Sequence, residues 1–273
     1  MKNISLGQYY PARSPIHRLD ARMKVILAVL YIVCTFLCKN VLCFAAIALS
    51  SILLILISRI PVSTVFRAIR PIIFIMIFTA TINLFFTKGE TLLFSWWKLQ
   101  IYMEGVYSAV FMVVRIIVLI LGTSIFLTYT TTPIALTDAL ESLLSPLRIF
   151  RAPVHEFAMM MTIALCFIPT LTEETSKIMN AQKARGVDFS EGGLIRRAKS
   201  LIPILIPLFV SSFRRADELA TAMECRCYRG GKGRTKMTVP HLHVRDFAAL
   251  LLMLAFGTGL VLLNRYGIGY TLL

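Results

Sequence analysis

The sequence predicts an all-α integral membrane protein with about five transmembrane helices and a long cytoplasmic or interfacial insert before the last one. Of its 273 residues, 57% are hydrophobic and only 16% are charged, whereas a soluble domain carries roughly a quarter charged residues. The mean hydropathy is +0.75, and the apolar runs lack the polar face of a surface helix. Lys and Arg also gather in alternate loops, as the topology of membrane proteins requires.

Five apolar runs are predicted to span the bilayer. The first is short for a hydrocarbon layer of about 30 Å, which needs about 20 helical residues. We therefore expect the preceding turn to extend it and a tight hairpin to join it to the second. In order, the runs are Val25–Cys38, Val41–Ile57, Pro71–Phe86, Val106–Leu127 and Asp246–Leu263. They divide the chain into residues 1–127, the insert 128–245, and the final span 246–273. No cleavage site of small residues precedes the first run, so a removable signal peptide is not expected.

The distribution of Lys and Arg predicts the orientation of these spans. The first 24 residues hold five, residues 58–70 hold three, and the insert holds sixteen of the chain's 29, whereas the loops between them hold one and two. Basic loops stay in the cytoplasm. The N-terminus and the insert are therefore predicted to be cytoplasmic in a prokaryotic cell membrane, with Trp96 and Trp97 at the outer interface. The net charge of +15 indicates cytoplasmic loops rather than nucleic-acid binding.

The insert has a different character from the rest of the chain. Its apolar segments Val154–Leu171 and Leu201–Val210 are expected to be broken at their prolines. Whether Val154–Leu171 also spans the membrane stays open; if it does, a partner segment must return before Lys177. Residues 194–210 are either an apolar face for a membrane partner or an interfacial helix that seals the protein's own core. The prolines are Pro169, Pro203 and Pro207.

Two segments of the insert resemble one another. Each is expected to be a helix with acids at its start and an arginine between two small residues near its end. Acids at the N-terminus and a cation at the C-terminus suit the helix dipole. Gly186 is placed to stop the first helix by adopting a positive φ, and Gly230–Gly231 are expected to stop the second about one turn later. The segments run from Glu173 to Gly186 and from Ala216 to Cys227.

These arginine triplets, together with the N-terminal stretch Gly7–Lys24, resemble the transmembrane (T) component of energy-coupling-factor (ECF) transporters, the EcfT/CbiQ family. The family's N-terminal stretch is written around H-x-L-D-P-R-x-K, and Ala21 replaces its proline here. The matching residues are His17, Leu19, Asp20, Arg22 and Lys24.

The resemblance implies a scaffold, without cofactor, that joins a membrane substrate-binding (S) component to two ATP-binding-cassette ATPases for uptake of vitamins or metal ions. Its coupling helices end in arginine motifs that dock into grooves of the ATPases. Cysteines flank the second arginine where the family has alanine and glycine, which leaves that helix end undetermined. The implied docking residues are Ala184, Arg185 and Gly186 on one helix and Cys225, Arg226 and Cys227 on the other. The N-terminal match favours a module shared by several S components.

Other sites in the insert are disfavoured by their spacing. A C-x-C pair places its thiols about 200° apart on a helix, so a zinc site from Cys225, Cys227, His241 and His243 is not expected. Gly233 follows Lys232 where a phosphate loop needs Ser or Thr, so ATP hydrolysis is assigned to a partner. The basic run 229–236 beside a membrane favours anionic lipid headgroups over nucleic acid.

The remaining polar residues favour structural roles. Arg115 within a span should face protein or water, and Asp138 and Glu141 are expected on a solvated face of the stretch 133–149. The motif around His17 is interpreted as a hydrogen-bonded cap. Without a nucleophile, general-base pair or metal cluster, no enzyme is predicted. The rival hypothesis is a stand-alone secondary transporter or channel, for which only Arg115 and Asn83 offer polar groups in the spans.

Overall fold

The computed structural model describes residues 9–12, 14–87, 92–96, 99–150, 153–187, 189, 193–230 and 242–266. Within these, the chain forms two compact units. One contains the described residues from 9 to 139 and from 242 to 266, and the other contains those from 140 to 230. The division into residues 1–127, 128–245 and 246–273 concerns the functional roles of these segments and stays a prediction.

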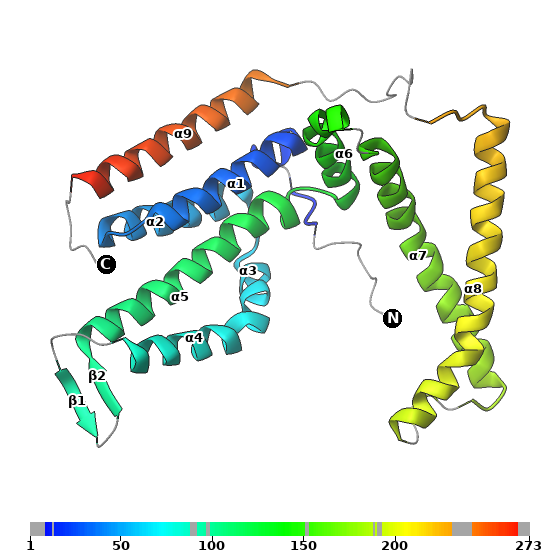
Figure 1. The fold of residues 1–273 in the computed structure, drawn as a ribbon, viewed down its shortest axis with the longest axis horizontal. Helices are drawn as coiled ribbons and strands as arrows, with labels where there is room; N and C mark the ends of the chain where they lie inside the picture. Colours follow the sequence, from blue (N-terminus) through cyan, green and yellow to red (C-terminus); the bar gives the residue numbers. More distant parts are fainter. Residues whose placement is uncertain are drawn as a thin grey trace. The chain divides into compact units, whose positions relative to one another are not determined.

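The first unit is built on a helical bundle of α1 (Ala21–Leu37), α2 (Val41–Ser58), α5 (Met103–Thr123) and α9 (Val244–Arg265) (Figure 1). A one-turn 3-10 helix, η1 (Ile16–Arg18), precedes α1, and a π-helical turn, η3 (Ser124–Tyr129), continues α5. Both α1 and α2 pack on α5 and α9. The buried core runs through these elements and includes Tyr31, Ile47, Ile125 and Tyr129.

Close packing in the bundle depends on one glycine. Gly122 of α5 lies against the ring of Tyr31 in α1, and a Cβ at this position would overlap that ring. Tyr31 is 1% exposed and its ring also contacts that of Phe126, so moving the ring would disturb the core. Small residues let helix backbones approach closely in membranes, where packing rather than hydrophobicity drives association.

A second layer of the same unit covers one side of α5. It consists of α3 (Val62–Ile69), the 3-10 turn η2 (Arg70–Ile72) and α4 (Ile73–Phe86), which packs along α5. An antiparallel hairpin of β1 (Leu92–Trp96) and β2 (Leu99–Tyr102) connects α4 to α5. The sequence did not predict this hairpin, whose β-branched and aromatic residues are common in strands. Trp96 ends β1, and Trp97 lies outside the described residues.

The second unit contains η4 (Ser145–Phe150) and two long helices, α7 (Val154–Ala184) and α8 (Leu194–Cys225), reached through α6 (Pro133–Leu143). We call α7 and α8 the helix pair; they contact each other and cross in Figure 1. The prediction that prolines break these segments was wrong. Pro169 lies inside continuous α7, and Pro203 and Pro207 lie inside α8, so α7 runs on past Lys177 without a returning segment.

Within the part of the chain that the structure describes, five helices are long and apolar enough to cross a membrane, which confirms the predicted number and class. Four of them coincide with the second to fifth predicted spans. The first predicted span lies in α1, whose 17 residues reach about 25 Å at 1.5 Å per residue. The fifth candidate is α7, which the sequence had left open. The candidates are Val41–Ser58, Ser63–Phe86, Met103–Tyr129, Val154–Ala184 and Val244–Arg265.

Candidate functional site

The C-terminus of α7 presents Arg185 at a sharp stop. Gly186 adopts φ +87°, and its N–H donates to the carbonyl of Lys183 at 3.0 Å while Val187 N–H donates to that of Gln182 at 3.1 Å. These two bonds make a Schellman motif, in which a left-handed residue closes the last helical turn. Arg185 is the cap residue immediately before the turn. Gly186 stops the helix as the sequence predicted.

The C-terminus of α8 has the same geometry with a different residue. Cys227 adopts φ +56°, its N–H donates to Glu224 O at 2.8 Å, and Tyr228 N–H donates to Met223 O at 3.0 Å. The prediction that Gly230–Gly231 stop this helix was therefore wrong. Because Cys227 takes the position of Gly186, Arg226 is the cap residue in the same register as Arg185.

Both arginine triplets are accessible. Each of the six residues from Ala184 to Gly186 and from Cys225 to Cys227 is exposed. Among the described residues, neither Arg185 nor Arg226 has an ion pair or side-chain hydrogen bond. Each guanidinium, with five N–H donors in a planar fork, is therefore available to bind a carboxylate of another molecule.

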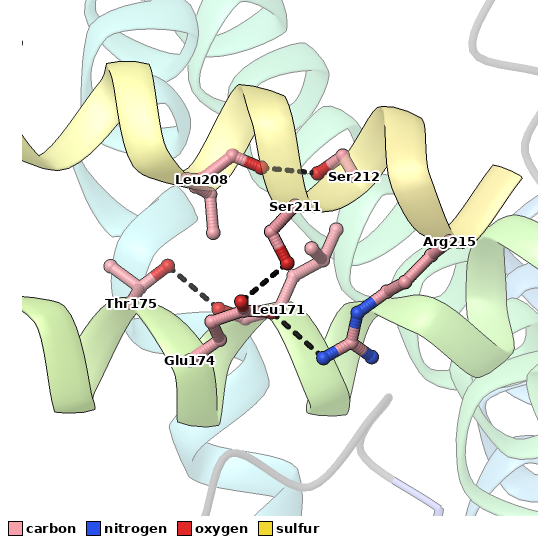
Figure 2. A network of polar contacts seen from close by, with 7 residues as sticks. All are labelled: Leu171, Glu174, Thr175, Leu208, Ser211, Ser212 and Arg215. Atoms are coloured by element: carbon pink, nitrogen blue, oxygen red, sulfur yellow. Dashed lines mark hydrogen bonds and ion pairs between the residues drawn. The ribbon is translucent and has the colours of Figure 1, made fainter. Parts of the chain in front are cut away.

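A polar cluster joins the two helices where they cross (Figure 2). Glu174 of α7 accepts a short hydrogen bond from the Ser211 hydroxyl through Oε1 and is paired through Oε2 with Arg215 at 2.9 Å. Ser211 and Arg215 are one turn apart on α8, so they lie on one face of that helix. We call Glu174, Ser211 and Arg215 the clasp. This pairing could not be predicted from the sequence, because Ser211 and Arg215 lie 37 and 41 positions after Glu174.

The clasp corrects the predicted place of the acids. Glu173 and Glu174 were expected at the start of a helix, but α7 begins at Val154 and they lie well inside it. Asp217 and Glu218 likewise lie in the last third of α8. The helix-dipole argument therefore does not apply to these four residues. The role of Glu174 is instead to hold α8.

The N-terminal motif forms a second polar cluster, in the other unit. Asp20 is the N-cap of α1, and its Oδ1 accepts the Arg22 N–H at 2.9 Å. The backbone N–H of Asp20 donates to Oδ1 of Asp246 at 3.0 Å, and Oδ2 of Asp246 accepts the N–H of His243 at 2.8 Å in a capping box at the start of α9. Asp246 is 1% exposed, so one buried carboxylate ties the starts of two helices together. Sequence reasoning missed this residue because it appeared only as the first residue of a span.

His17 and Lys24 extend this cluster to the end of η3. His17 Nε2 lies 2.9 Å from Tyr10 O and must donate to it, and Nδ1 lies 2.7 Å from the Ser14 hydroxyl. Burial lowers the pKa of His17 below its ordinary 6.5. The hydrogen bond to the Tyr10 carbonyl partly opposes this shift, and the positive charge of Lys24 adds to it. Lys24 is 2% exposed and donates to the carbonyls of Thr130 at 2.7 Å and of His17 at 3.3 Å. These contacts bind backbone groups of the protein itself, as in a structural cap.

The other motif residues fit the same arrangement. Leu19 packs against the bundle core. Ala21 is the first helical residue of α1, the position at which proline is favoured because its missing N–H would be unpaired there. Alanine at this position therefore keeps the helix start that the family's proline gives.

The weaker candidates are used internally. Arg115 donates to the carbonyl of Cys38 at 3.2 Å and lies over the Phe44 ring at 5.1 Å, and Asn83 donates to Thr79 O at 2.9 Å. Glu141 is not on a solvated face, as had been expected, because it is 7% exposed and lies 3.1 Å from Nδ1 of His155. Asp138 is exposed. Residues 231–241 lie outside the described residues, and with them Lys232, Gly233, His241 and most of the basic run 229–236.

Comparison with known proteins identifies the family. The family model of CbiQ, described as a cobalt transport protein, matches residues 12–237. Relatives named energy-coupling factor transporter transmembrane protein EcfT include that of Clostridium kluyveri, 50% identical over 92% of this chain and 93% of the relative. That of Ruminiclostridium cellulolyticum is 52% identical over 87% and 88%, and that of Acidaminococcus fermentans is 47% identical over 98% and 99%. The chain belongs to the EcfT/CbiQ family.

Proposed function

We propose that this protein is the membrane scaffold of an ECF-type importer, which transmits the ATP-driven motion of two ATPase subunits to a membrane S component during uptake of vitamins or metal ions. ATP hydrolysis takes place in the partners, and this chain carries no catalytic step. Names of the relatives, which specify a transmembrane protein of an ECF transporter, support the proposal. The S component selects the substrate.

The observation that carries the proposal is the equivalence of the two helix ends. Arg185 and Arg226 occupy the same cap position in two Schellman turns, are exposed, and are followed by residues in the left-handed region. A single exposed arginine at a helix end is common. Two in the same local geometry fit a partner that offers two equivalent acidic grooves, as a pair of ATPases does.

The clasp connects these two ends mechanically. Glu174 holds Ser211 and Arg215, so a displacement of one helix end is passed to the other helix through this contact. The apolar side chains Phe209 and Phe213 of α8 are each more than half exposed and offer a membrane partner an apolar surface. We propose that this surface contacts the S component. When the ATPases displace the helix ends, the clasp passes that displacement to α8 and so to this surface.

This role places both arginine ends on the cytoplasmic side, where ATP is available. The N-terminus and residues 128–245 are assigned to the same side from their excess of Lys and Arg. On this assignment α1, α2, α5 and α9 cross the prokaryotic cell membrane together with the α3–α4 segment. The polar second half of α7, with Glu173, Glu174 and Lys177, lies outside the hydrocarbon.

A stand-alone transporter or channel would need polar groups free to bind a substrate near the bilayer midplane. Arg115 and Asn83, the polar groups on which that hypothesis rests, both bond to backbone carbonyls. Nothing in the described residues favours that hypothesis, and the EcfT/CbiQ membership supports the scaffold.

A charge reversal at both helix ends tests the proposal. We expect the double variant Arg185→Glu/Arg226→Glu to lose the ATPase subunits on co-purification and to lose uptake, because each glutamate would be repelled by the acidic groove that receives the arginine. Each single variant should retain part of the complex. The measurement is the ratio of ATPase subunits to this chain after affinity purification from cells that co-express them.

A matched control uses two cations on the same helices that lie away from the ends. Lys177→Glu/Arg214→Glu makes the same change in net charge at exposed positions and should leave assembly intact. Full assembly and wild-type uptake in the Arg185→Glu/Arg226→Glu variant would refute docking through these residues.

A further inference from the structure

The bundle contains a groove with a charged end and an apolar remainder, which the scaffold role does not use. Its volume is about 1100 Å³, and it lies between α1, α2 and α9. Arg18, Arg59 and Arg245 line one part of it. Most of the other lining residues are apolar, among them Leu27, Leu49, Leu53, Ala249, Leu252 and Phe256.

The three arginines lie at one end of the groove because of the chain's topology. Arg18 comes just before α1 begins, Arg59 just after α2 ends, and Arg245 is in the first turn of α9. All three are exposed, and none has an ion pair or side-chain hydrogen bond to a described residue. The neighbouring carboxylates Asp20 and Asp246, two residues after Arg18 and one after Arg245, bind backbone N–H groups and do not line the groove.

The length of the groove matches one leaflet of a bilayer. From Arg245 to Phe256, the last residue of α9 that lines the groove, is 11 residues, or about 16 Å at 1.5 Å per residue. Half of a hydrocarbon core of about 30 Å is about 15 Å, so the groove accommodates acyl chains from the headgroup level to the midplane.

The backbone at Arg59 adds a further observation. Arg59 ends α2 with φ +54°, a left-handed conformation that glycine adopts without strain and other residues adopt at a cost. Arg59 therefore occupies a helix-end position that glycine would fill without strain.

We propose that this groove binds one acidic phospholipid, with the phosphate contacted by Arg18, Arg59 and Arg245 and the acyl chains against α1, α2 and α9. Basic pockets between transmembrane helices bind anionic headgroups in this way. A headgroup with net negative charge complements these three arginines better than a zwitterionic one, whose own cation offsets its phosphate, and an apolar helix of a partner offers them no anion. With the orientation proposed above, the site faces the cytoplasmic leaflet, which is rich in anionic lipid.

Native mass spectrometry of the detergent-solubilised full chain tests this inference, with dioleoyl phosphatidylglycerol and dioleoyl phosphatidylcholine as probes. We expect one retained phosphatidylglycerol and weaker retention of phosphatidylcholine. The variant Arg18→Gln/Arg59→Gln/Arg245→Gln should bind phosphatidylglycerol about 100-fold more weakly, since each basic residue near the surface contributes about fivefold. Equal retention of both lipids by the wild type would overturn the proposal.

Two further variants keep the test decisive if the triple variant folds poorly. Ala249→Trp fills the groove and leaves the arginines in place, so it should also expel phosphatidylglycerol. Arg67→Gln/Arg70→Gln/Arg214→Gln removes three exposed arginines that do not line the groove, so this control variant should retain phosphatidylglycerol. If the groove variants keep phosphatidylglycerol but lose a co-purifying membrane partner, the occupant is a helix and the lipid assignment is wrong.

Discussion

The bundle and the helix pair are held together by different means. In the bundle, α1, α2, α5 and α9 share one buried core, and Gly122 brings α5 against the ring of Tyr31. In the helix pair, most side chains are exposed and few are fully buried, Ile204 and Ala158 among them. There the polar clasp around Glu174 supplies the specific contact.

This difference corresponds to different mechanical properties. Interdigitated side chains resist displacement because every neighbour must move, so the bundle is suited to remain one body. A crossing fixed by one carboxylate allows the helices to rotate about it while they stay attached. The helix pair also leaves apolar surface for partners, as an element of a larger assembly requires. Four substitutions would break or sharpen this comparison.

The largest effect is expected in the bundle. Gly122→Ala places a methyl group on the Tyr31 ring and should lower the stability by about 1–3 kcal/mol, as overpacking of a core does. The thermal midpoint of the purified chain measures the change. The matched control is Gly259→Ala in α9, where an added Cβ meets nothing within 4 Å. If Gly122→Ala lowers the midpoint less in a Tyr31→Ala background than in the wild type, the clash lies at the Tyr31 ring. Equal midpoints for Gly122→Ala and Gly259→Ala would contradict this account.

A smaller effect is expected at the clasp. Glu174→Gln removes the charge that pairs with Arg215, and because both side chains are partly exposed the loss should be about 1 kcal/mol or less. Hydrogen exchange of the backbone amides of α7 and α8 near the crossing should accelerate by up to about fivefold, with the bundle amides unchanged. Glu173→Gln, at the exposed neighbouring position, is the control. Equal exchange in the two variants would mean that apolar packing alone holds the crossing.

The most local effects are expected at the two helix ends, where they should be comparable to that at the clasp and opposite in sign. Gly186→Ala forces a side chain into φ +87° and should cost about 1 kcal/mol, whereas Cys227→Gly relieves φ +56° and should gain slightly less. Hydrogen exchange in the last turn of each helix reports the change. If Cys227→Gly destabilises the last turn of α8 instead, the Cys227 side chain makes a stabilising contact that outweighs the strain at its backbone.

The sequence predicted those features that follow from local composition. The spans, the number of membrane helices and the stop at Gly186 all follow from apolar runs and from glycine's tolerance of positive φ. The stop at Cys227 was missed because cysteine gives no such signal, and the preceding arginine triplet alone does not fix the register. The end of α8 was therefore expected one turn too late.

Features that depend on tertiary contacts could not be predicted. Pro169, Pro203 and Pro207 each remove one backbone hydrogen bond, but α7 and α8 continue through them in the folded chain. The clasp joins residues about 40 positions apart, and the hydrogen bond between Asp20 and Asp246 joins residues 226 apart. No periodicity in the sequence connects such residues.

The position of the clasp gives each long helix two unequal arms. From Glu174 the chain runs 11 residues to Arg185, about 16 Å, and 20 residues back to Val154, about 30 Å. From Ser211 it runs 15 residues to Arg226, about 22 Å, and 17 back to Leu194, about 26 Å. All three prolines lie on the longer arms and none on the shorter. If the clasp acts as a fulcrum, α7 is a lever with a stiff short arm at its arginine and an amplification of about twofold at its apolar end.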